Sequence, residues 1–239
     1  RESGIPAVIV PSCNVQEAAF VEGIRVFGAE NLAQVIAHIS GQNPLSPARQ
    51  KPSDVQDVQD DSFAHIKGQL AAKRGLIVAV AGGHNILMNG TPGSGKTLLA
   101  RSAVGLLPSM TRQESMEVAK IYSSVGLLRG PVTSLARPFC APHHTASSAS
   151  IVGGGATPRP GQVSLSHRGV LFLDEFPEFA RNTLEALRQP LEDGVVTISR
   201  VTGSLTLPAK FMLVAAMNPC PCGNLGDQSA VCTCTASTI

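Results

Sequence analysis

The octapeptide GTPGSGKT, residues 90–97, constrains the fold of this chain more than any other segment. It fits the pattern G-x-x-x-x-G-K-[ST], with an apolar strand expected at 85–89 before it and an apolar-periodic helix at 96–107 after it. Its glycines let the backbone curl so that N–H groups point at phosphate oxygens, and the helix start adds partial positive charge. A simple glycine turn is the alternative, but the flanking elements favour a nucleotide-binding loop.

Each position of this phosphate loop has an expected role. Lys96 is expected to reach the β- and γ-phosphates of ATP, and the Thr97 hydroxyl to ligate Mg²⁺. The residues expected to contact nucleotide through this loop are Gly90, Thr91, Pro92, Gly93, Ser94, Gly95, Lys96, Thr97 and Leu98.

Two further strands end in polar residues that complete the expected site. The segment VLFLDE, 170–175, reads as a buried strand followed by Asp174 and Glu175 at the edge where ligands bind in open α/β sheets. Asp174 is expected to hold Mg²⁺, and Glu175 to polarise the attacking water. The strand FMLVAAMN ends in Asn218, which is expected to orient that water or contact the γ-phosphate. The expected catalytic residues are therefore Lys96, Glu175 and Asn218.

Apolar strands alternate with helical patterns from residue 62 onward, which predicts an α/β fold with a mostly parallel sheet covered by helices. Residues 195–210 instead read as two strands around a Thr-Gly-Ser turn, a β-hairpin inserted before the last strand. The other elements expected are a helix around 69–80, the strand and helix that flank the phosphate loop, a strand at 170–173, a helix near 181–192 and a strand at 211–217.

The first 61 residues have a different organisation. Residues 1–42 show a strand at 7–11, a helix, a second strand at 24–28 and a helix at 31–39, too little chain to bury a sheet alone. We expect this fragment to be the C-terminal end of a domain, and the chain, which opens on Arg1, to be a piece of a longer protein. Residues 43–61 have the composition of a linker, or of an ordered loop, and 62–239 form the expected ATPase core.

Composition excludes several classes of protein. A net charge of +2 with 15% charged residues provides no global basic field, so any nucleic-acid contact must be local. The absence of Trp and the single Tyr argue against base recognition on stacked aromatic rings. The longest apolar run is too short for a membrane helix and no signal-peptide pattern is seen, so a cytoplasmic protein is expected.

Two clusters of metal-ligand residue types stand out. Cys220 and Cys222, followed by Cys232 and Cys234, are compatible with a structural tetrahedral zinc site, with free cytosolic thiols as the alternative. In RPFCAPHHTASSAS, residues 137–150, Cys140, His143 and His144 lie within five positions, and Cys140 and His143 could approach one metal. However, adjacent histidines are expected to point apart and no fourth ligand is near, so this segment is interpreted as a contact for DNA or a neighbouring subunit.

Five segments together resemble the magnesium-chelatase-like AAA+ ATPases of the ComM/YifB type. They are GGHNILMNGTPGSGKTLLA, RPFCAPHHTASSASIVGGG, PRPGQVSLSHRGVLFLDEFPEF, LEALRQPLEDGVVTISRV and AAMNPCPCG. The resemblance implies a hexameric ring that uses ATP and Mg²⁺ and acts on DNA by branch migration in natural transformation. It also implies that 1–42 ends a Lon-protease-like domain, and that IKGQ, 66–69, lines the adenine pocket with Ile66 and Gly68. The family typically carries Arg where this chain has Cys140.

The same resemblance sets expectations for activity. Family members continue into an arginine finger and a helical lid that do not follow residue 239 here, so this chain alone is expected to bind ATP poorly or hydrolyse it slowly. The hairpin would place Arg200, with Lys210 nearby, at a threaded DNA strand, or would only pack on a neighbouring subunit. A subunit that drives magnesium insertion into a porphyrin, and a scaffold that binds ATP without productive hydrolysis, are the alternative functions.

Overall fold

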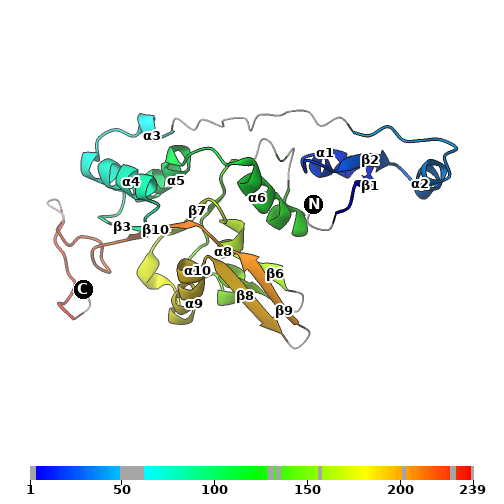
Figure 1. Ribbon diagram of the computed structural model, residues 1–239. Coiled ribbons are helices and arrows are strands. Elements are labelled where there is room, and N and C mark those ends of the chain that lie inside the picture. Colours follow the sequence, from blue (N-terminus) through cyan, green and yellow to red (C-terminus); the bar gives the residue numbers. More distant parts are fainter. Residues whose placement is uncertain are drawn as a thin grey trace. The chain divides into compact units, whose positions relative to one another are not determined.

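A computed structural model describes residues 4–48, 62–128, 132, 136–155, 158–200, 203–226 and 230–237 (Figure 1). The chain divides into two compact units, one of residues 1–56 with 129–135, the other of 57–128 with 136–239. Most of the predicted linker, from residue 49 to 61, lies outside the described residues. The two units are described separately below.

The first unit contains the predicted strand, helix, strand and helix. β1 (Ala7–Pro11) and β2 (Arg25–Ala29) pair in parallel, joined through the 3₁₀ turn η1 (Ser12–Asn14) and the short helix α1 (Val15–Ala18). Asn31 caps α2 (Leu32–Ile39) by accepting a hydrogen bond from the Gln34 N–H. Three apolar side chains of α2 are exposed, those of Leu32, Ile36 and Ile39. The assignment of this unit to a Lon-protease-like domain stays a prediction.

A four-stranded parallel sheet organises the second unit, which confirms the predicted α/β fold. Its strand order is β3, β10, β7, β4, so the last strand among the described residues lies between the strands of the two nucleotide motifs. The bounds are β3 (Ile86–Asn89), β4 (Phe139–Cys140), β7 (Val170–Leu173) and β10 (Met212–Met217). All four strands therefore end at the same edge of the sheet.

Both faces of this sheet are covered, because successive side chains of a strand point to opposite sides. Val170 and Phe172 of β7 pack in a core with α4 (Leu70–Gly82) and α5 (Lys96–Leu106). Leu171 and Leu173 pack on the other side, in a core with α7 (Ser148–Val152), α8 (Gln162–Leu165) and the base of the hairpin. All four residues of β7 are at most 1% exposed, as expected for a central strand.

Several elements differ from the sequence-based expectation. α6 (Arg112–Ser124) was not predicted, although Thr111 and Glu114 form a capping box at its start. The helix expected near 181–192 is two helices, α9 (Arg181–Ala186) and α10 (Arg188–Asp193), because Pro190 has no N–H for the carbonyl of Ala186. The other elements not predicted are α3 (Ser62–His65), β4, α7, α8, the antiparallel pair β5 (Gly153–Gly154) and β6 (Arg159–Pro160), and η3 (Phe176–Glu178).

The inserted hairpin is confirmed as β8 (Val195–Arg200) and β9 (Gly203–Pro208), an antiparallel pair that extends away from the sheet (Figure 1). Val196 and Ile198 are buried against the body of the unit, whereas Thr197 between them is exposed. The predicted turn at Thr202, Gly203 and Ser204 is placed differently, because Gly203 and Ser204 belong to β9 and pair with β8; residues 201 and 202 lie outside the described residues. In the part of the chain that the structure describes, no helix is long and apolar enough to cross a membrane.

Candidate nucleotide site

The phosphate loop joins the end of β3 to the start of α5. Gly93 and Gly95 have φ angles of +76° and +87°, in the left-handed region that glycine adopts most easily, and Gly95 is the N-cap of α5. A Cβ added at either glycine would have no heavy atom within 4 Å. This side of the loop is therefore open, as a loop that wraps a phosphate chain requires. Leu98, expected to contact nucleotide, lies in the first turn of α5 and is 53% exposed.

Lys96 connects the loop to the neighbouring strand end. Its Nζ donates to the carbonyl oxygens of Gly90 (2.6 Å) and Thr91 (3.0 Å) and to the Asn218 Oδ1 (3.1 Å). Burial lowers the pKa of Lys96, and the negative charge of Asp174 partly opposes this shift. The structure thus brings together two of the three predicted catalytic residues, from segments that are 122 positions apart.

Oxygen ligands gather beside Lys96. The Thr97 hydroxyl donates to Asp174 Oδ2 over 3.0 Å, while the Glu175 N–H donates to Asp174 Oδ1 over 3.0 Å. A hydroxyl and a carboxylate at this spacing are the protein ligands that Mg²⁺ prefers when it also holds phosphate oxygens and water. Glu175 itself has a φ of +52°, a left-handed conformation that costs a residue with a Cβ about 1 kcal/mol or more.

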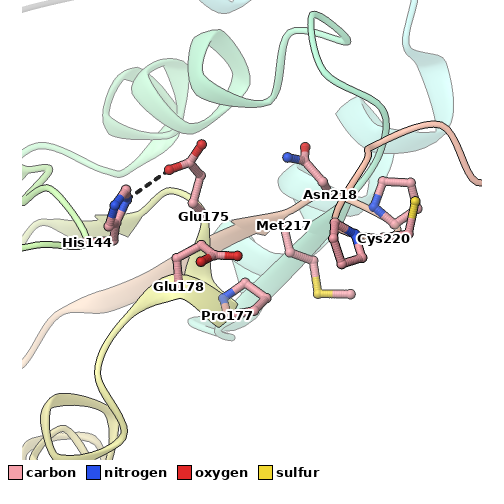
Figure 2. Close-up of a pocket in the computed structure, with 9 residues that line it drawn as sticks. His144, Glu175, Pro177, Glu178, Met217, Asn218 and Cys220 are labelled. Carbon is pink, nitrogen blue, oxygen red and sulfur yellow. Dashed lines mark ion pairs between the residues drawn. The ribbon is translucent and has the colours of Figure 1, made fainter. Parts of the chain in front are cut away.

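Glu175 is held by a residue that the motif does not contain. Its Oε2 lies 2.8 Å from His144 Nδ1, and the His144 side chain is 28% exposed (Figure 2). This pair borders two cavities. One, of about 340 Å³, includes Thr97 and Asp174, and the other, of about 440 Å³, includes Asn218 and Cys220. The His144–Glu175 pair is therefore a shared wall between the metal-ligand side and the Asn218 side of the site.

The prediction that His143 and His144 point apart was wrong. Their ring centroids are 4.1 Å apart, and both residues line the cavity that includes Thr97 and Asp174. His143 Nδ1 contacts the Thr145 hydroxyl over 2.9 Å. Cys140 is buried in β4, and burial raises the pKa of its thiol to about 12, so it is a core side chain. Whether His143 or His144 contacts DNA stays a prediction.

The predicted adenine segment lies beside the phosphate loop. Ile66 is buried in the core formed with α4 and α5, and its carbonyl accepts a hydrogen bond from Lys73 Nζ. Gly68 has a φ of +70°. Gln69, which the sequence analysis did not single out, donates from Nε2 to the carbonyl of Ser94 over 3.2 Å. The contact of Ile66 and Gly68 with a base stays a prediction.

The four C-terminal cysteines converge. Their Sγ atoms all lie within 4.8 Å of one another, and three of the separations are 3.4 Å (Cys220 to Cys222), 3.7 Å (Cys220 to Cys232) and 3.7 Å (Cys222 to Cys232). Hydrogen bonds from the backbones of Asn224 and Thr233 are the main causes that lower the pKa of Cys222, to about 6. Among the described residues, this is the one group of three or more metal-ligand side chains close enough to share an ion.

The predicted DNA contacts Arg200 and Lys210, and two further basic residues, Arg159 and Arg168, are differently placed. The side chain of Arg200 lies outside the described residues, and Lys210 is exposed between β9 and β10. Arg159 is exposed in β6. Arg168, in contrast, is paired with two glutamates of α6, Glu117 at 2.9 Å and Glu114 at 3.4 Å, and so has little charge to offer DNA.

The comparisons with known proteins agree with this geometry. The family described as Magnesium chelatase, subunit ChlI, matches residues 62–239. An uncharacterised protein of Mycobacterium tuberculosis is 45% identical over the whole chain, YifB of Escherichia coli 44% over 95%, and Competence protein ComM of Haemophilus influenzae 45% over 91%. The chain spans 47%, 44% and 43% of these relatives, about half of their length. The chain belongs to the magnesium chelatase subunit ChlI family of AAA+ ATPases.

Proposed function

We propose that the protein hydrolyses ATP as part of a ring-shaped motor that acts on DNA. The observation that supports this best is the convergence of Lys96, Thr97, Asp174, Glu175 and Asn218 at one edge of a parallel sheet. The 45% identity to a competence protein favours DNA as the substrate of the motor. The chain spans 43% of this relative, so the proposal concerns the activity of a protein of the relative's full length.

Each residue of the site has a distinct task in this proposal. The backbone N–H groups of the open phosphate loop bind the phosphate oxygens, and Lys96 neutralises charge on the β- and γ-phosphates. Thr97 and Asp174 would hold Mg²⁺, and the bound ion would supply positive charge to offset the charge that develops on the phosphates. Glu175 accepts a proton from the attacking water, and Asn218, already bonded to Lys96, orients the reacting groups.

The hairpin β8–β9 is the proposed contact with DNA. It extends from the unit (Figure 1), with the tip bounded by Arg200 and Gly203. In a ring of identical chains, one basic residue per hairpin is presented several times to the same strand, and phosphate contacts add. A chain with a net charge of only +2 can therefore bind DNA locally when it is assembled.

ATP turnover of the full-length protein with single-stranded, duplex and four-way DNA tests this proposal. We expect at least one DNA form to raise kcat, and Glu175→Gln to lower turnover about 10²-fold or more while the protein still binds ATP. Stimulation by no DNA would count against the motor and would favour the chelatase-type subunit. A wild type as slow as the Glu175→Gln variant would instead indicate a scaffold.

We further propose that Cys220, Cys222, Cys232 and Cys234 bind structural zinc. Four thiolates at the Zn–S distance of about 2.3 Å form a tetrahedron with S···S separations of about 3.8 Å. Three of the Sγ separations in the cluster, at 3.4–3.7 Å, are close to this value. The donor set, all sulfur, is one that selects zinc over the oxygen-preferring Mg²⁺ of the nucleotide site.

A further inference from the structure

The loop that carries Cys220 and Cys222 is in contact with the phosphate loop. Gly223, with a φ of +80°, approaches Pro92 so closely that an added Cβ would lie 2.7 Å from the Pro92 Cγ. Its N–H donates to the Cys220 carbonyl over 2.9 Å, which closes a tight turn from Cys220 to Gly223 within the cysteine loop. Only a residue without a side chain allows this approach.

A second connection begins at the other end of the same loop. Asn218, two residues before Cys220, accepts a hydrogen bond from Lys96 Nζ, and both Asn218 and Cys220 border the cavity that contains Glu175 (Figure 2). The segment from Asn218 to Gly223 therefore contacts the phosphate loop twice, at Pro92 and at Lys96.

The cysteine cluster is the feature that can hold this segment in place. The described residues from 218 to 237 contain no helix or strand, so regular backbone hydrogen bonding does not fix their conformation. A metal that joins 220 and 222 to 232 and 234 cross-links the segment, and removal of the metal leaves four sulfur atoms crowded within 4.8 Å.

From these contacts we infer that metal bound by the four cysteines controls the affinity of the nucleotide site. Zinc holds Gly223 against Pro92 and Asn218 against Lys96, so that the phosphate loop is pre-shaped for ATP. Loss of zinc releases both contacts. The inference rests on the zinc site proposed above, and it assigns to that site a regulatory effect on nucleotide binding.

The first experiment removes and restores the metal in the wild-type full-length protein. Zinc content is measured by atomic emission before and after dialysis against a chelator. The chelator is then removed, Mg²⁺ is restored, and the Kd for a fluorescent ATP analogue is measured. We expect about one zinc per chain, a Kd at least about tenfold higher after removal, and recovery when zinc alone is added back. Recovery in the same polypeptide excludes irreversible unfolding as the cause.

The second experiment changes the contact and leaves all four cysteines in place. Gly223→Ala forces a Cβ toward Pro92, whereas Gly226→Ala is a matched control, because Gly226 also has a φ of +80° but no heavy atom within 4 Å of an added Cβ. We expect both variants to retain zinc. The Kd of Gly223→Ala for the ATP analogue should be at least about fivefold higher than the Kd of Gly226→Ala.

The outcomes separate the inference from the proposals on which it rests. Protein purified without zinc that also fails to bind added zinc would overturn both the metal site and this inference, but not the DNA-stimulated ATPase. Bound zinc whose removal leaves the Kd within about twofold would overturn the coupling and keep the metal site. Equal effects of Gly223→Ala and Gly226→Ala would show that backbone strain, not the Pro92 contact, changes affinity, and would also count against the inference.

Discussion

Glu175 has both its backbone and its side chain held in a defined conformation. Its backbone is left-handed and its side chain is paired with His144 over 2.8 Å, although half of that side chain is exposed. A base that must meet one water molecule gains from a fixed orientation, and a hydrogen-bonding partner supplies this in many sites where a nucleophile or base is oriented by a third group. His144 is thus expected to position Glu175 for its reaction.

Replacement of His144 tests this positioning role. We expect His144→Ala to lower kcat about tenfold with KM for ATP within about twofold, because the general base loses orientation while the phosphate contacts remain. His144→Asn, which can donate from near the position of Nδ1, should recover part of kcat. His143→Ala is the matched comparison, since its ring lies 4.1 Å away but bonds Thr145, and its effect should be clearly smaller. An equal loss in both variants would contradict the positioning role.

At the residue scale, the sequence predicted those groups whose position follows from a motif. Lys96, Thr97 and Asp174 lie at fixed steps from a strand end or a helix start, so the motif determines where they lie. The partner of Glu175 does not follow from a motif, because His144 reaches it from a segment 31 positions earlier, after β4, a strand of two residues that no hydrophobic pattern reveals. Its side-chain direction depends on tertiary packing alone.

At the element scale, a polar network joins α6 to the residues that precede β7 and β10. His167 is 2% exposed, and its Nδ1 accepts from the Lys210 N–H (3.0 Å), so its Nε2 carries the hydrogen and donates to Glu117 (3.1 Å). Burial lowers the pKa of His167, and the contact with Glu117 only partly opposes this. Burial disfavours the charged form of Glu117 and so raises its pKa. Hydrogen bonds from Arg168 and His167 outweigh this effect, and the pKa of Glu117 is lowered.

This network predicts that acid destabilises the fold. Because the pKa of His167 is lowered, the unfolded state binds its proton first as pH falls through the ordinary value of 6.5, and the free energy of unfolding decreases. Glu117 adds a loss in the same direction at lower pH, as its unfolded-state pKa of 4.5 is approached. Thermal unfolding between about pH 7.5 and pH 5.5 should therefore show a falling Tm.

Variants separate this network from general acid sensitivity. His167→Asn keeps an acceptor near Nδ1 for the Lys210 N–H but does not titrate, so its Tm should be lower at neutral pH and depend less on pH. His65→Asn is the control, since His65 is exposed at the end of α3, and it should keep the wild-type slope. A slope unchanged by His167→Asn would contradict the assignment.

The elements themselves were predictable to different degrees. Strands β7 and β10 carry continuous apolar runs that end in polar residues, and both lie where they were expected. α6 was missed because its apolar residues form no long periodic run, although the capping box of Thr111 and Glu114 was a readable signal. The break between α9 and α10 was also readable, since Pro190 lies inside the expected helix.

At the scale of the whole molecule, the proposed ring implies that subunits act together. Suppose that each ring holds six chains and that one inactive chain stops the ring. At a random mixing ratio of one Glu175→Gln chain to five wild-type chains, about a third of the rings, (5/6)⁶, contain only wild type, so about a third of the DNA-stimulated turnover remains. Chains that act independently would keep about five sixths of it. Turnover is measured over a series of mixing ratios after subunit exchange. Mixtures with His65→Asn, which leaves the nucleotide site unchanged, should keep full turnover at every ratio, and a linear fall for Glu175→Gln would contradict a concerted ring.

The strand order of the sheet has a consequence for how the protein is made. β10 lies between β3 and β7, so the strand that ends the nucleotide core is the one that joins the phosphate loop to the acidic pair. During synthesis, Lys96 and Asp174 are added to the chain before Met217, and β3 and β7 have no shared neighbour in the sheet until β10 is made. The nucleotide site is thus completed in one late step of folding, and nascent chains that stop before β10 have both motifs and no ATP site.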